Sequence, residues 1–235
     1  MAPAVSNRLL AGVEVPDTPL INAALDFTRE HMPEVLYHHC VRSWLFGCII
    51  ATKVPRFAGM DREVHAIVTL FHDIGLIDGD GDKAVGIVSE DKRFEVDGAN
   101  AARDFLRREA DAAHWDQHRQ QLVWDSIALH TTPSISLHKE VEVQAAIAGM
   151  FTDILRHLPE FGGLVGDEEW SAVCKEYPRL NNLKDAATEM LCNICRKKPE
   201  TTYDNFLRDY GEKHVEGYSA VGKRVMDALD NMYLS

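Results

Sequence analysis

The apolar residues of this chain recur with the period of an α-helix over most of its length. In the segment 62–75, REVHAIVTLFHDIG, they fall at 64, 67, 68, 70, 71 and 74, which is the spacing of one helical face. The same period, interrupted by turn-rich connectors, predicts helices at about 19–31, 34–52, 61–74, 97–110, 115–130, 140–158, 184–195 and 216–233. Strand-like alternation is scarce, so the pattern predicts an all-α fold.

The connectors suggest one domain preceded by a short arm. Residues 1–19 contain three prolines and are predicted to form an N-terminal arm, while 20–235 are predicted to form a single helical bundle. Asp17 or Thr18 followed by Pro19 is a typical helix start. The segment 160–183 is irregular, and we expect it to cover one mouth of the bundle.

Composition narrows the classes of function. The formal net charge of −12 argues against a nucleic-acid surface, which needs clustered Lys and Arg. No apolar stretch reaches the roughly 18–20 residues of a membrane span, and the first residues do not resemble a secretory signal. Five cysteines, an odd number, fit a reduced compartment, so we expect a cytoplasmic protein without membrane or nucleic-acid partners.

The pair His72-Asp73 stands where one apolar helix pattern ends. Adjacent helical positions point about 100° apart, so both side chains reach one metal ion only if it lies beside the helix end. An imidazole with a carboxylate suits zinc, iron, manganese or cobalt better than calcium or magnesium. The alternative is an ordinary helix end at which Asp73 is solvated.

Two histidines precede this pair on the helix predicted at 34–52. His38 is in register with Val41, Leu45 and Ile49, which suggests core packing. His39 is in register with Ser43 and Gly47, whose small size leaves room beside it. We therefore favour His39 as a metal ligand.

Two further polar residues interrupt apolar helices downstream. His130 ends a helix at Thr131-Thr132-Pro133, and Asp153 lies among Ile147, Met150, Phe151, Ile154 and Leu155. A carboxylate on an apolar helix is costly unless it is paired or bound to a metal. The alternatives are a helix cap for His130, and for Asp153 a salt bridge to Arg156 or Lys139 or an exposed face.

The order of these residues resembles a known family. His39 with Arg42, His72-Asp73 after an apolar helix, and a lone Asp153 far downstream resemble the H…HD…D signature of the HD-domain superfamily. That resemblance implies a helical bundle with a divalent metal between its helices. The ligands implied are His39, His72, Asp73 and Asp153.

Further segments narrow the resemblance to the fungal cyanamide hydratases: RFEVDGA (93–99), IALHTT (127–132), KEYPRLN (175–181) and RKKPETTYDNF (196–206). The resemblance spans about 30–230 and implies hydration of cyanamide, or of a related small nitrile, to urea by a metal-activated hydroxide. It implies zinc, although iron or manganese accept the same donors. His130, Glu95 and Asp73 are the expected catalytic residues, with Thr131 and Thr132 as substrate contacts. For Glu95 the alternative is a salt bridge to Arg93 or Lys92.

Two other functions remain open on the sequence. The first is an HD-type phosphohydrolase acting on a nucleotide or small phosphoester, which needs cations to bind phosphate; Arg42 is a candidate. The second is a catalytically idle scaffold or ligand-binding protein, which need not retain a complete ligand set.

Two surface features complete the predictions. Asp78, Asp80 and Asp82 have the spacing of a calcium loop, but its sixth and twelfth positions hold Lys83 and Ser89, so we expect a flexible acidic turn. A candidate surface for a homo-oligomer is the C-terminal segment YSAVGKRVMDALDNMYL, or the cluster of Trp44, Phe46 and Ile49–Ile50.

Overall fold

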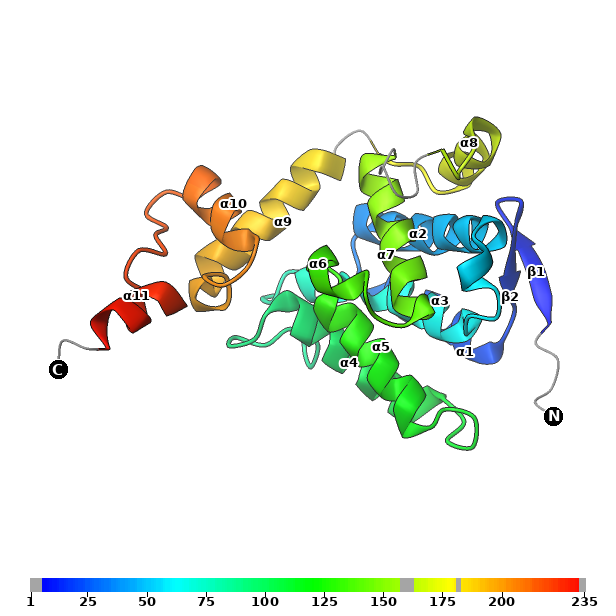
Figure 1. The fold of residues 1–235 in the computed structure, drawn as a ribbon, viewed down its shortest axis with the longest axis horizontal. Coiled ribbons are helices and arrows are strands. Elements are labelled where there is room, and N and C mark those ends of the chain that lie inside the picture. The colour runs from blue at the N-terminus through cyan, green and yellow to red at the C-terminus, as the bar shows by residue number, and fades with distance from the viewer. Residues whose placement is uncertain (1–5, 157–162, 181–182, 233–235) are drawn as a thin grey trace.

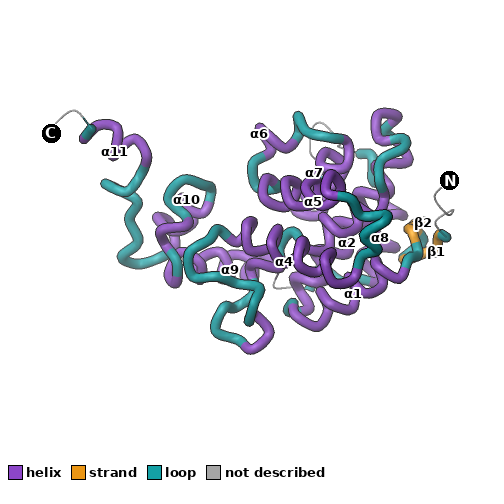
Figure 2. Tube along the Cα trace, turned by 90° about the horizontal axis from the view of Figure 1, so that it is seen from below, coloured by secondary structure: helices purple, strands orange, loops and turns teal. Residues whose placement is uncertain are grey.

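The computed structural model describes residues 6–156, 163–180 and 183–232 and shows a helical bundle (Figures 1 and 2). Its helices are α1 (Pro19–His31), α2 (Glu34–Lys53), α3 (Arg62–Phe71), α4 (Phe94–Glu109), α5 (Gln117–Leu129), α6 (Pro133–Ser136), α7 (Val141–Leu155), α8 (Asp167–Glu176), α9 (Leu183–Lys197), α10 (Leu207–His214) and α11 (Val225–Asn231). The all-α prediction is therefore confirmed. No described helix is long and apolar enough to cross a membrane.

The N-terminal segment differs from the predicted arm. Strands β1 (Asn7–Leu10) and β2 (Val13–Pro16) form an antiparallel hairpin whose turn holds Gly12 at a φ of 79°. Val13 and Val15 are buried while Glu14 between them is exposed, as the twofold period of a strand requires. This short apolar alternation joins residues 7–16 to the body of the protein. Residues 1–5 of the predicted arm lie outside the described residues.

Helix α2 is the centre of the bundle. Every side chain from Val35 to Ile50 is buried, because α3 and α7 both pack along it (Figure 1). The approach of α7 is close: a Cβ built on Gly149 would lie 2.1 Å from the carbonyl oxygen of Ser43. Only glycine permits this contact, which fixes the distance between the two helices.

Helix α3 starts and ends for identifiable reasons. The side chain of Asp61 accepts hydrogen bonds from the backbone N–H groups of Glu63 and Val64. The helix ends at Phe71, earlier than predicted, and a short 3₁₀ turn follows at Ile74–Leu76. Gly75 in that turn admits the carbonyl of Phe94, which would lie 2.1 Å from an added Cβ. His72 and Asp73 consequently lie between two helical segments, with their side chains free to point into the bundle.

The C-terminal third departs most from the predicted elements. The segment predicted to be irregular contains α8, and α10 was not predicted. The last helix is shorter than predicted because Gly217 and Gly222 adopt positive φ angles of 77° and 80°. Helices α9, α10 and α11 extend away from the bundle, with α11 at the far end (Figure 1).

Candidate metal centre

Three helices bring the polar residues of the bundle to one place. His39 lies in the second turn of α2, His72 and Asp73 follow α3, and His130 ends α5. All four residues are at least nine-tenths buried. The packing of α3 against both α2 and α5 therefore assembles a group of three imidazoles and one carboxylate from positions up to 91 residues apart.

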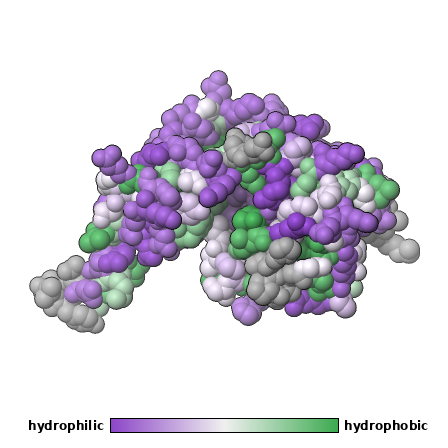
Figure 3. Space-filling model, turned by 90° about the horizontal axis from the view of Figure 1, so that it is seen from above, coloured by the Kyte–Doolittle hydropathy of each residue, from purple (hydrophilic) through white to green (hydrophobic). Residues whose placement is uncertain are grey.

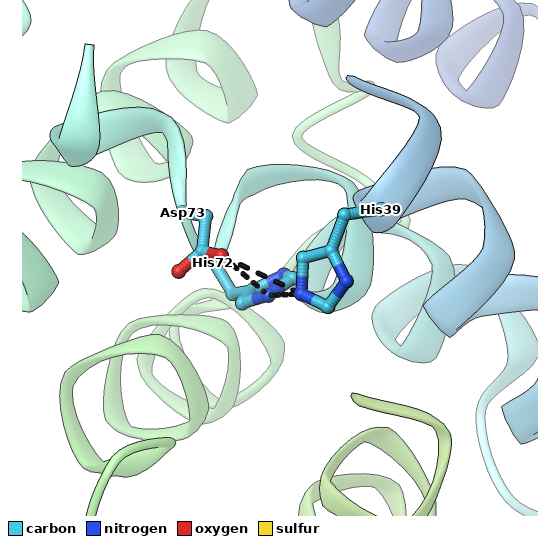
Figure 4. A group of neighbouring side chains, drawn as sticks. All are labelled: His39, His72 and Asp73. Carbon is cyan, nitrogen blue, oxygen red and sulfur yellow. Dashed lines mark hydrogen bonds and ion pairs between the residues drawn. The ribbon is translucent and has the colours of Figure 1, made fainter. Parts of the chain in front are cut away.

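The metal-binding atoms of three of these residues converge (Figure 4). The Nε2 atoms of His39 and His72 are 3.2 Å apart. Asp73 Oδ2 lies 3.5 Å from Nε2 of His39 and 3.2 Å from Nε2 of His72. One donor atom from each residue lies within 4.8 Å of the others, which no other group of three or more His, Cys, Asp or Glu residues achieves within the described residues.

The other ring nitrogens fix which nitrogen of each imidazole is free. His39 Nδ1–H donates to Asp153 Oδ2 at 2.7 Å, and His72 Nδ1–H donates to the carbonyl of Thr69 at 2.9 Å. In the neutral rings both Nε2 atoms then carry lone pairs that face each other, which is repulsive unless a cation lies between them. Two imidazole nitrogens and a carboxylate are also suitable donors for zinc, iron or manganese. The residues present therefore fit a divalent metal.

Asp153, the fourth predicted ligand, lies behind His39. Its carboxylate accepts Nε–H of Arg42 at 2.7 Å and Nη2–H of Arg42 at 2.8 Å, and Arg179 donates to the same group at 2.8 Å. Burial would raise the pKa of Asp153, but the hydrogen bonds and charges of His39 and Arg42 outweigh it and hold this pKa well below its usual value. The structure thus places Asp153 against Nδ1 of His39, whereas Nε2 faces His72 and Asp73. A direct contact between Asp153 and the metal stays a prediction.

The ion pair of Asp153 differs from the alternatives considered on the sequence. Its partners are Arg42 and Arg179, and neither Arg156 nor Lys139 contacts it. Arg42 lies one turn after His39 on the same helix, and this spacing is the only sequence signal for the arrangement. Arg179 lies in the loop after α8, too far along the chain for a local pattern to connect it with Asp153. Sequence reasoning missed Arg179 as a residue of the site.

His130 reaches the group as well as capping its helix. Its Nδ1–H donates to the carbonyl of Ile127 at 2.7 Å, and its Nε2 lies 3.4 Å from Asp73 Oδ1. Burial alone would lower the pKa of His130, but the hydrogen bond and charge of Asp73, with the charge of Glu95, outweigh burial and raise it. His72 differs, because burial outweighs Asp73 and lowers its pKa.

Glu95 and Thr131 pair with each other. Glu95 is fully buried in the first turn of α4, where Arg93 Nη2–H and Thr131 Oγ–H donate to its Oε1 at 2.7 and 2.6 Å. Burial raises the pKa of Glu95, but the bond and charge of Arg93 and the charge of His130 prevail and lower it. The salt bridge to Arg93 considered on the sequence is thus present. The hydroxyl of Thr131 is bonded to Glu95, and its contact with substrate stays a prediction.

Thr132 and the acidic turn lie outside this group. Thr132 precedes α6, and its carbonyl accepts the N–H groups that start that helix. Asp78 and Asp80 are exposed and both pair with Lys197 at the end of α9. The turn therefore links the segment after the metal helix to the C-terminal helices.

Comparison with known proteins agrees with this geometry. The model of the HD domain family matches residues 36–232, which includes all the site residues named above. No curated protein matches the chain. Members of the family are typically metal-dependent hydrolases. With its helical bundle and its group of His39, His72 and Asp73, the chain belongs to the HD domain family.

Proposed function

We propose that this protein is a metal-dependent hydratase that adds water to the nitrile of cyanamide and releases urea. The family and the candidate metal site support metal-dependent chemistry with water. The choice of a small nitrile comes from the resemblance of four segments between residues 93 and 206 to the fungal cyanamide hydratases.

The observation that carries the proposal is the charge around the site. Arg42 and Arg179 are both bonded to Asp153, and Arg93 is bonded to Glu95. A phosphoester substrate needs cationic donors for its oxygens. Among the described residues, each arginine close to the metal-binding group already holds a buried carboxylate. This arrangement favours a small neutral substrate over a nucleotide.

His39, His72 and Asp73 would hold the metal, most suitably zinc. When bound, such an ion supplies Lewis acidity and lowers the pKa of a water molecule to about 7. Asp153 and the Thr69 carbonyl orient the two imidazoles through Nδ1, so that both Nε2 atoms stay available.

We assign to His130 the proton transfer that the reaction requires. Hydration forms one C–O bond and breaks one C–N π bond, and the nitrile nitrogen takes a proton to give isourea. Shifting a second proton from oxygen to nitrogen then gives urea. The raised pKa of His130 favours a protonated ring next to Asp73; His130 donates its Nε2 proton to the nitrile nitrogen and is protonated again by the proton that the attacking water loses. Glu95 maintains this state through its negative charge and positions Thr131, the neighbour of His130.

The test combines metal content with two product assays. Purified protein is analysed for zinc, iron and manganese, then assayed for urea from cyanamide and for phosphate from nucleotides and small phosphoesters. We expect about one metal per chain and urea without phosphate. Release of phosphate without urea would overturn the proposal and indicate a phosphohydrolase. Metal-free protein that forms neither product would indicate a scaffold.

A matched pair of histidine variants tests whether His130 takes part in the reaction. His130→Gln removes the proton donor next to Asp73, whereas His118→Gln changes an exposed histidine at the start of α5. We expect His130→Gln to keep its metal and lose most urea release, and His118→Gln to resemble the wild type. Equal activity of both variants would remove His130 from the mechanism.

A further inference from the structure

Helix α8 and the segment 177–179 that follows it approach the metal centre from the surface. Helix α8 lies at the top of the molecule in Figure 1, on the largely hydrophilic face that Figure 3 shows. The carbonyls of Tyr177 and Pro178 accept Nη1–H of Arg42 at 3.2 and 3.0 Å. His38 Nδ1–H donates to the Pro178 carbonyl as well, at 3.1 Å. The segment is therefore bonded to α2 at two residues that flank the metal-binding histidine of that helix.

Arg179, the last residue of this segment, completes the hydrogen bonding of the Asp153 carboxylate. An ionised carboxylate offers about four lone-pair sites. Oδ2 of Asp153 accepts from Nδ1 of His39 at 2.7 Å and from Nη2 of Arg42 at 2.8 Å. Oδ1 accepts from Nε of Arg42 at 2.7 Å and from Nη1 of Arg179 at 2.8 Å. All four sites are thus filled, so the carboxylate cannot rotate away from His39 without breaking a bond to a guanidinium group.

The same guanidinium of Arg179 also fixes the backbone behind this carboxylate. Its Nη1 donates to the main-chain carbonyl of Asp153 as well as to Oδ1. The Asp153 side chain is fully buried, whereas that of Arg179 is 35% exposed. Arg179 therefore connects the surface of the protein to a buried group that orients a metal ligand.

An aromatic ring of α8 holds Arg179 in this position. Trp170 stacks on Phe46 of α2 with ring centroids 4.7 Å apart and planes 6° apart. Two guanidinium groups lie over the Trp170 ring, with Cζ of Arg156 4.8 Å and Cζ of Arg179 5.5 Å from its centroid. Of these two arginines, only Arg179 donates to Asp153. The pair therefore separates packing on the ring from contact with the carboxylate.

We propose that Arg179 is a positioning residue of the metal centre, which acts through Asp153 to hold the ring of His39 with Nε2 toward the metal. The inference rests on the metal site of the proposed function but not on the choice of substrate. Loss of a partner that orients a metal ligand typically weakens metal binding about 10–100-fold. Arg179 acts through one intervening residue, so we expect an effect of about tenfold, at the lower end of that range.

The first test compares the two arginines that share Trp170. Arg179→Met removes the donors but keeps a long side chain over the ring, and Arg156→Met makes the same change at a side chain of similar exposure, 39%. Chelator competition measures the zinc affinity of the full chain. We expect Arg179→Met to bind zinc about tenfold more weakly, and Arg156→Met to match the wild type. Arg179→Lys keeps one charged donor and should recover part of the loss.

A double-mutant cycle distinguishes positioning from a general structural role. In Asp153→Asn the carboxylate through which Arg179 acts is gone. Adding Arg179→Met to that variant should therefore weaken zinc binding by less than about twofold further. An equal loss in both backgrounds would show that Arg179 does not act through Asp153 and would overturn the inference.

The remaining outcomes separate this inference from the proposed function. Equal zinc affinities of the wild type and Arg179→Met would overturn the positioning role, while the urea assay on the wild type still decides the proposed reaction. Weaker zinc binding by Arg179→Met in a protein that releases no urea would support the positioning role and overturn the choice of substrate. A wild type that binds no zinc would overturn both.

Discussion

Helix α3 and the residue after it hold two buried histidines with opposite surroundings. His65 and His72 are seven residues apart, two helical turns, and therefore face the same side. His65 Nδ1 is 3.9 Å from the sulfur of Cys48, and its Nε2 has no hydrogen-bond partner. His72 has its Nδ1 fixed by a carbonyl, and its Nε2 faces an imidazole and a carboxylate.

The difference shows that burial alone does not make a histidine a metal ligand. Burial, with the charge of Arg62, lowers the pKa of His65 to about 3, which keeps the ring neutral. Burial also lowers the pKa of His72, but Asp73 opposes it. A ligand needs an oriented ring, a free nitrogen and a neighbouring carboxylate that favours a cation. Only the His72 end of this segment has all three.

The largest effect is expected from substitutions at His72 and Asp73, which should remove the metal. His72→Ala or Asp73→Ala removes one of the converging donors, so each variant should lose bound metal and reduce urea release by at least about a thousandfold. Metal analysis and the urea assay measure this. The matched control is His65→Leu, which should retain its metal. Full activity in either the His72 or the Asp73 variant would exclude the site.

The buried His65 should lower the free energy of unfolding as the solution becomes acidic. His65 is neutral in the folded protein down to about pH 3, whereas in the unfolded chain it binds a proton below about pH 6.5. Its contribution to stability is therefore complete above pH 6.5 and is lost as the pH falls, by up to about 1.4 kcal/mol per unit.

Urea titrations at pH 7, 6 and 5 measure this slope. His65→Leu should flatten it, and His118→Gln, at an exposed position, should leave it unchanged. An equal slope in wild type and His65→Leu would show that His65 takes up its proton in the folded state.

The space around His65 gives the next prediction. A Cβ on Gly47 would lie 2.3 Å from His65 Nε2, so Gly47→Ala should destabilise the fold by about 1–3 kcal/mol. His65→Ala in the same chain should recover part of that loss. Gly149→Ala meets the backbone oxygen of Ser43 at 2.1 Å, and no side-chain substitution should rescue it. Chemical denaturation of the wild type and these three variants measures the differences in their free energies of unfolding.

The smallest effect is expected for Asp153→Asn, and it distinguishes two roles of Asp153. If Asp153 only orients His39, Asp153→Asn keeps a hydrogen-bond acceptor and weakens metal binding about 10–100-fold. Chelator competition measures the affinity. Complete loss of metal, as in the Asp73 variant, would instead make Asp153 a direct ligand.

Local sequence patterns were enough to predict most of the helices of the bundle. Thr18 accepts the N–H of Ile21 before Pro19, as the sequence predicts for this helix start. The choice of His39 over His38 agrees with its position beside His72, but the reason differs. Ser43 and Gly47 are small because α7 and His65 approach them closely, and they do not make room for a ligand. His38 bonds to the carbonyl of Pro178 instead.

The sequence by itself determined most helices of the bundle, the start of α1 and the residues capable of holding a metal, because caps and apolar periodicity are local properties of the chain. Only the tertiary structure decided which buried polar residues pair with one another. Asp153 is bonded to Arg42, 111 residues away, and Glu95 to Thr131, 36 residues away. A buried carboxylate requires partners, but which cation or hydroxyl supplies them depends on how the helices pack, and no local pattern records that packing.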